Sequence, residues 1–120
     1  MKYCYDDLFY IINNYYWINE TIKQNEMLIE QSKNNVFLMN LNKQKIGEVN
    51  ELKDKVNYID ESVELINDDK VYWIILLLME GSTKSKIKKI MRISHTTLMK
   101  KVDEGIETIL NHEREKEMIN

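Results

Sequence analysis

Hydrophobic residues recur every three or four positions along most of this chain, and that spacing predicts α-helices. Two such segments lie in the N-terminal half, and each follows the a and d positions of a heptad. The first runs through Cys4, Leu8, Ile11, Tyr15, Ile18, Ile22, Asn25 and Ile29, and the second through Val49, Leu52, Val56, Ile59, Val63 and Ile66. The two seams can pack on each other as a hairpin, or pair between chains as a dimerisation arm. A hairpin can itself dimerise as a four-helix bundle.

Three further helices are predicted in the C-terminal half, over about residues 69–80, 84–91 and 95–115. The first is an apolar run that stops at Gly81, a residue free to adopt the positive φ of a helix C-terminus. Ser82 or Thr83 can cap the second helix, and Ser94, with Thr97 at the third position, can cap the last. The apolar positions of the last helix are Leu98, Val102, Ile106 and Ile109.

These elements predict an all-α protein with two parts. Residues 1–67 would form a helical hairpin or coiled-coil-like arm for dimerisation or interaction, and residues 68–120 a DNA-binding helix-turn-helix domain. The polar stretch from Gln31 to Asn42 separates the two N-terminal helices. A short apolar run within it, Val36 to Leu41, receives no predicted element.

The positive charge of the chain is concentrated in one segment. Residues 1–80 carry a net charge of −6, residues 81–101 carry +7 and residues 102–120 carry −4, which together give −3. Residues 81–101 contain no Asp or Glu. A charge run is usually a solvated face, but ordinary surfaces mix both signs. A basic, acid-free helix–turn–helix is therefore typical of a protein that binds the phosphate backbone of DNA.

Residues 71–110, VYWIILLLMEGSTKSKIKKIMRISHTTLMKKVDEGIETIL, resemble sigma-factor region 4 and its helix-turn-helix relatives. The matching positions are Gly81, Ile87, Ile90, Ile93, Ser94, Thr97, Leu98 and Val102. The layout of the whole chain, a helical N-terminal half before such a unit, also resembles the ArpU/RinA group of phage late transcription regulators. The resemblance implies that residues 95–111 are a recognition helix for the major groove of DNA.

Three positions depart from the family pattern. Lys88 stands where relatives have a small residue, so its ammonium group must extend outwards along its stem. Arg92 stands where many relatives have Gly, at a turn position where φ is expected to be positive. Gly105 replaces the usual Ala, which indicates a close contact between helices.

The resemblance assigns roles to the residues of the basic segment. The candidates for contact with base edges are His95, Thr96, Thr97, Met99 and Lys100. The candidates for contact with phosphates are Lys84, Lys86, Lys89, Arg92 and Lys101. Thr97 has an alternative role as a local cap of the helix, and His95 an alternative as a solvent-exposed residue of the first turn.

Other classes of function find little support. His95 and His112 do not have the spacing of metal ligands, and the only glycines, Gly47, Gly81 and Gly105, form no phosphate loop or nucleophile elbow. We therefore expect no catalytic residue, no metal and no cofactor. Cys4 is the single cysteine, and the longest apolar run, Val71 to Met79, is too short to span a membrane. We expect a cytoplasmic protein without a membrane partner.

Two functions remain. The first is a sequence-specific DNA-binding transcription regulator of phage or mobile-element type, acting on double-stranded DNA as a homodimer. The second is a protein-interaction module that binds RNA polymerase or another regulator with little direct DNA contact.

Overall fold

The protein is all-α. The computed structural model describes residues 2–33, 35 and 39–119, with only the backbone for 39–41 and 119, and this part of the chain contains no strand. Its elements are α1 (Tyr5–Ser32), α2 (Met39–Ser62), a short 3-10 helix η2 (Val63–Leu65), α3 (Asp69–Met79), α4 (Lys84–Met91) and α5 (His95–Ile119). Part of the apolar run 36–41 lies outside the described residues.

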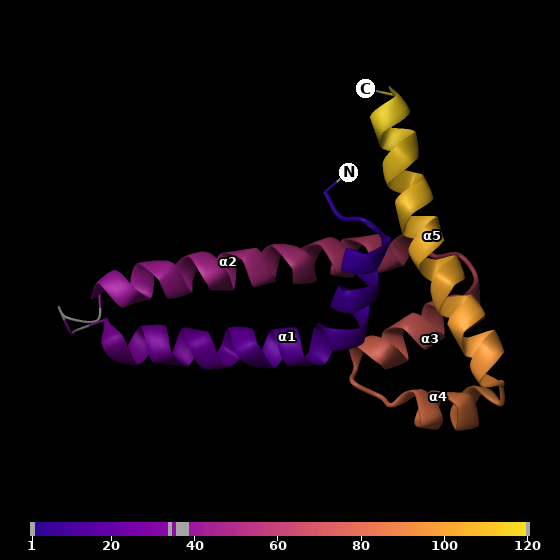
Figure 1. The fold of residues 1–120 in the computed structure, drawn as a ribbon, viewed down its shortest axis with the longest axis horizontal. Coiled ribbons are helices and arrows are strands. Elements are labelled where there is room, and N and C mark those ends of the chain that lie inside the picture. Colours follow the sequence, from indigo (N-terminus) through magenta and orange to yellow (C-terminus); the bar gives the residue numbers. More distant parts are fainter. Residues whose placement is uncertain (1, 34, 36–38, 120) are drawn as a thin grey trace.

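Helices α1 and α2 run side by side in opposite directions and project from the rest of the molecule (Figure 1). Most apolar positions of the two heptad seams are buried, with Ile18, Ile22, Val49 and Val56 all less than a tenth exposed. Cys4, the first position of the first seam, is exposed. Polar contacts lie along the edges of the pair. The Tyr15 hydroxyl donates to Asp60 Oδ1 at 2.5 Å, and Lys53 Nζ lies 2.5 Å from Glu26 Oε1.

Helix α1 bends, so its first turns run in a different direction from the rest (Figure 1). Beyond these turns, the side-chain amides of Asn13 and Asn14 donate to the carbonyl oxygens of Phe9 and Tyr10, at 2.7 and 2.9 Å. Side chains that bond to the carbonyl four residues earlier are a known cause of helix bending. The first turns thereby reach α3 and α5.

The core is continuous from α1 to α5. Its fully buried side chains come from every helix and include Leu8, Ile11, Ile12, Ile59, Ile74, Ile75, Ile87, Leu98, Val102, Ile106 and Ile109. The N-terminal turns of α1 are thus part of the same hydrophobic cluster as the three C-terminal helices. Burial of this cluster is what holds α3, α4 and α5 in their relative positions.

The three C-terminal helices confirm the predicted segments to within four residues. α3 begins after Asp68, whose carboxylate accepts the backbone N–H of Val71 at 3.1 Å. α4 begins after Thr83, whose hydroxyl accepts the backbone N–H of Lys86 at 3.1 Å. α5 extends to Ile119, beyond the predicted end at residue 115. Caps of this kind fix where each helix starts.

Two glycines occupy crowded positions. At Gly105 in α5, an added Cβ would lie 3.1 Å from side-chain carbons of both Val71 and Ile75, so α3 and α5 approach closely there, as the sequence indicated. Gly81, after α3, has φ +89°, and its added Cβ would lie 3.2 Å from Cγ of Tyr16. Gly81 therefore satisfies both a left-handed turn and a close contact with α1.

The substitution Gly81→Ala is expected to lower the free energy of unfolding by about 1–3 kcal/mol, because the strained backbone and the contact with Tyr16 act in the same direction. Gly47→Ala is the matched control. Gly47 lies within α2, and a Cβ added there would meet nothing within 4 Å beyond its chain neighbours and the nearby backbone of its own helix, so Ala should stabilise the helix by about 1 kcal/mol. Urea unfolding of the two variants measures both changes, and equal effects at the two positions would contradict this account.

Candidate nucleic-acid interface

The turn between α4 and α5 is built from local hydrogen bonds. α4 ends at Met91, and the residue that caps it, Arg92, has the left-handed conformation φ 56°, ψ 51°. The backbone N–H groups of Arg92 and Ile93 both donate to the carbonyl of Lys88. The Ser94 hydroxyl then accepts the backbone N–H of Thr97 at 3.1 Å and caps α5. The positive φ expected at Arg92 is thus confirmed, and the turn fixes the direction in which α5 leaves it.

The inner faces of α4 and α5 are apolar and closed to solvent. Ile87 in α4 and Leu98 and Val102 in α5 are at most 1% exposed. α4 and the first turns of α5 lie next to each other, at the end of the molecule remote from the tip of the α1–α2 pair (Figure 1). The polar side chains of both helices therefore face outwards from one rigid unit.

The five candidates for base contact differ in exposure. His95, Thr96 and Lys100 are exposed, whereas Thr97 and Met99 are half-buried. Thr96 and Lys100 lie four residues apart and so share one side of the helix. The Thr97 hydroxyl accepts a hydrogen bond from the Ser94 hydroxyl at 3.0 Å, so it takes part in the cap. The outward surface at the start of α5 is formed mainly by the three exposed residues.

The candidates for phosphate contact fall into two groups. Lys86, Lys89 and Arg92 are exposed. Lys84 and Lys101 instead face other groups of the protein. Lys84 Nζ lies 5.8 Å from the centroid of the Phe9 ring, and Lys101 Nζ lies 3.4 Å from Glu104 Oε2. Lys86, Lys89 and Arg92 are therefore the candidates whose positive charges are most accessible to a phosphate.

Asp68 lies on the Lys101 side of α5. The backbone N–H of Val71 lowers the pKa of the Asp68 carboxyl, and the positive charge of Lys101 lowers it further. Asp68 therefore stays ionised at neutral pH, close to Lys101 at the C-terminal end of the basic segment. Its negative charge reduces the field of Lys101 and leaves that of Lys86, Lys89 and Arg92 as the outward positive surface.

The outward side of α5 becomes acidic after its second turn. Asp103 is exposed and Glu104 and Glu107 are half-buried, and these residues continue the side of the helix that carries Lys100. Three carboxylates at this position would repel a phosphate backbone. The basic surface is thus confined to α4, the turn and residues 95–101. The sequence contained this signal, because the predicted apolar positions of the helix already place Asp103, Glu104 and Glu107 away from the core.

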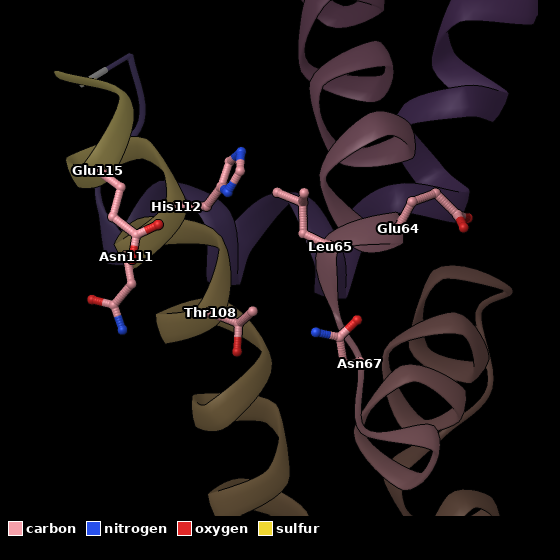
Figure 2. A pocket seen from close by; sticks show the side chains of 7 residues that line it. All are labelled: Glu64, Leu65, Asn67, Thr108, Asn111, His112 and Glu115. Atoms are coloured by element: carbon pink, nitrogen blue, oxygen red, sulfur yellow. The ribbon is translucent and has the colours of Figure 1, made fainter. Parts of the chain in front are cut away.

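A cleft lies between α5 and the segment that follows α2. This open cleft of about 470 Å³ is lined by Glu64, Leu65, Asn67, Thr108, Asn111, His112 and Glu115. Glu64 points away from His112 and Glu115 (Figure 2), and its carboxylate accepts the Tyr72 hydroxyl at 3.1 Å. No cluster of three or more His, Cys, Asp or Glu among the described residues could hold a metal ion. The cleft therefore gathers no metal-ligating set.

Comparison with known proteins gives no match to a family model, to a curated protein or to a solved structure. Among the described residues, no helix is both long and apolar enough to cross a membrane.

The substitution Arg92→Gly is expected to raise stability. The left-handed conformation costs an ordinary residue roughly 1–2 kcal/mol, and the greater chain entropy of Gly offsets roughly 0.5–1 kcal/mol of the gain. Arg114→Gly, the same change inside α5, should instead destabilise by about 1 kcal/mol. Thermal unfolding measures both. A loss of stability at Arg92 equal to that at Arg114 would mean that Arg92 is not strained.

Proposed function

We propose that the protein is a sequence-specific DNA-binding transcription regulator of phage or mobile-element type, with α5 as its recognition helix in the major groove. The observation that carries the proposal is the acid-free segment 81–101. Four of its seven basic residues lie on α4, two lie on α5, and Arg92 lies in the short turn that joins these helices. The resemblance of this segment to sigma-factor region 4 supports it. Neither catalysis nor a cofactor is needed for this function.

The proposed orientation places the N-terminal end of α5 towards the bases. Lys100 would donate to guanine O6 or N7, His95 to a base acceptor, and Thr96 would contact a thymine methyl group. Thr97 and Met99 would contribute less, because they are half-buried. The carboxylates that follow the second turn of α5 favour this orientation. If the helix instead lay in the groove along more of its length, Asp103 and Glu107 would come near phosphates.

The phosphate contacts would come from both sides of the turn. Lys86, Lys89 and Arg92 are exposed and need no rearrangement. Lys84 would have to leave the Phe9 ring and Lys101 would have to leave Glu104. Both costs are small, because an exposed cation–π contact contributes about 0.5–1 kcal/mol and a surface ion pair about 0–1 kcal/mol. These contacts would position the protein on the duplex without reading its sequence.

The proposal includes a homodimer bound to an inverted repeat, because single helix-turn-helix modules bury little DNA surface and commonly act on two half-sites.

The alternative function is a module that binds RNA polymerase or another regulator. One observation favours it, namely that Trp73 in α3 and Ile90 in α4 are 57% and 54% exposed. Large exposed apolar side chains are typical of protein interfaces. Lys100→Ala separates the two functions, because only the DNA-binding function requires that side chain on the bases.

The test begins with selection of bound sequences from a pool of random duplexes. Lys100→Ala should then weaken binding to the selected sequence by about 1–3 kcal/mol and relax the preference at one base pair. Lys116→Ala is the matched control, because Lys116 is also an exposed lysine of α5 but lies in its last turn. It should leave affinity and preference unchanged.

Neither substitution should shift the thermal unfolding midpoint by much, since both side chains are exposed. Failure of the selection to enrich any sequence, or equal losses of affinity in the two variants, would refute specific DNA recognition by α5. Retained binding of purified RNA polymerase by Lys100→Ala would then favour the alternative.

A further inference from the structure

An aromatic pair in the first two turns of α1 reaches both α4 and α5. The rings of Tyr5 and Phe9 stack on each other, with centroids 6.3 Å apart and an interplanar angle of 17°. Both side chains are half-buried and pack against the hydrophobic core. The start of the helix is fixed by Asp7, whose carboxylate accepts the backbone N–H of Cys4 at 3.0 Å. The pair is therefore held in place from the α1 side, independently of the basic segment.

Each ring meets one charged side chain at an end of the basic segment. Lys84 is the first residue of α4, and its Nζ lies 5.8 Å from the centroid of the Phe9 ring. The Tyr5 hydroxyl faces Asp103 of α5 as a hydrogen-bond donor. Lys84 is the first basic residue of segment 81–101, and Asp103 is the first acidic residue after it. The aromatic pair thus restrains the charges that mark the two ends of the basic segment.

The Tyr5 hydroxyl is protonated at neutral pH and can donate to Asp103. Burial raises the pKa of Tyr5, and the hydrogen bond to Asp103 with the negative charges of Asp103 and Glu107 raises this pKa further, to about 12. A hydrogen bond to an ionised carboxylate is stronger than one between neutral groups, so it restrains the carboxylate. Asp103 and Lys100 are three residues apart and are neighbours on the surface of α5. An Asp103 carboxylate released from Tyr5 would be free to turn towards Lys100 and the DNA.

We propose that Tyr5 and Phe9 are positioning residues for DNA binding, with effects of opposite sign. Tyr5 favours binding, because it holds the Asp103 carboxylate against α1 and away from the phosphate backbone. Phe9 opposes binding, because Lys84 must leave the ring before its ammonium group can reach a phosphate. The inference rests on the proposed function and assigns the N-terminal helix a part in setting the DNA affinity of the basic segment.

The opposite signs separate this role from a structural one. Tyr5 and Phe9 lie one turn apart in the same helix and pack against the same core. If the pair only supported the fold, a loss at either position would loosen α1 against the C-terminal helices and weaken DNA binding. A gain of affinity at one position and a loss at the other requires that the two rings act on charges of opposite sign.

The test measures the affinity of the full chain for a duplex of arbitrary sequence by fluorescence anisotropy, at low ionic strength, where charges are least screened. Phe9→Leu keeps an apolar side chain and removes the ring, so it should raise the association constant by about two- to fivefold, the range of an exposed cation–π contact. Tyr5→Phe keeps the ring and removes the hydroxyl. It should lower the association constant by about twofold, the effect in water of one unit charge brought to about 10 Å from a phosphate.

Two double variants identify the charges responsible. In an Asp103→Asn background, Tyr5→Phe should leave the affinity unchanged, because no carboxylate remains to be restrained. In a Lys84→Gln background, Phe9→Leu should leave the affinity unchanged, because no ammonium group remains on the ring. Each variant is measured well below its thermal unfolding midpoint, so loss of the folded state does not contribute.

Tyr15→Phe is the matched control. Tyr15 also donates its hydroxyl to a carboxylate, that of Asp60, but within the α1–α2 pair. Removal of this hydroxyl should therefore leave DNA affinity unchanged, and a loss equal to that of Tyr5→Phe would overturn the proposal.

The remaining outcomes distinguish this inference from the proposed function. Changes of the same sign in Phe9→Leu and Tyr5→Phe, no change in either, or a Tyr5→Phe effect that persists beside Asp103→Asn would overturn the inference alone. DNA binding by the basic segment would then stand without help from α1. A wild-type chain that does not bind the duplex at low salt would instead refute the proposed function, and this inference with it.

Discussion

The close packing of α5 against α3 is the contact on which the rest of the structure depends. Gly105 allows this close approach, because a Cβ added there would lie only 3.1 Å from side-chain carbons of Val71 and Ile75. Leu98, Val102, Ile106 and Ile109 then turn one whole side of α5 into the core, each at most 1% exposed. Because that side is fixed, the opposite side is fixed too, and it presents His95, Thr96 and Lys100 to solvent. Any role of this helix in recognition rests on that packing.

The second constraint is the bend of α1, which joins the projecting helix pair to the C-terminal helices. Leu8, Ile11 and Ile12 belong to the same hydrophobic cluster as the buried residues of α3 and α5. The cluster therefore includes residues on both sides of residue 67, the predicted end of the N-terminal part. A straight α1 would carry these side chains away from α5. The shared hydrophobic cluster therefore fixes the position of the basic segment 81–101 relative to the first turns of α1.

The sequence predicted those features that depend on local chemistry. Thr83 and Ser94 determine helix starts through their own backbone neighbours, and Arg92 stands where the turn requires a positive φ. The sequence did not distinguish packing of the two heptad seams within one chain from pairing between two chains, because the same apolar pattern suits both. It also gave no sign that α1 would bend into the core. The acidic outward side of α5 could have been predicted from the sequence, because the predicted apolar positions Leu98, Val102 and Ile106 already place the acidic residues on the other side of the helix.

The central claim, that the basic segment binds the phosphate backbone of DNA, is tested most directly by the dependence of affinity on salt. If the five candidates Lys84, Lys86, Lys89, Arg92 and Lys101 each neutralise a phosphate, the logarithm of the association constant should fall against the logarithm of salt concentration with a slope of about −4.5 per protomer. The measurement needs only the full chain and a double-stranded fragment of arbitrary sequence. A slope near zero, or no binding at low salt, would contradict the claim.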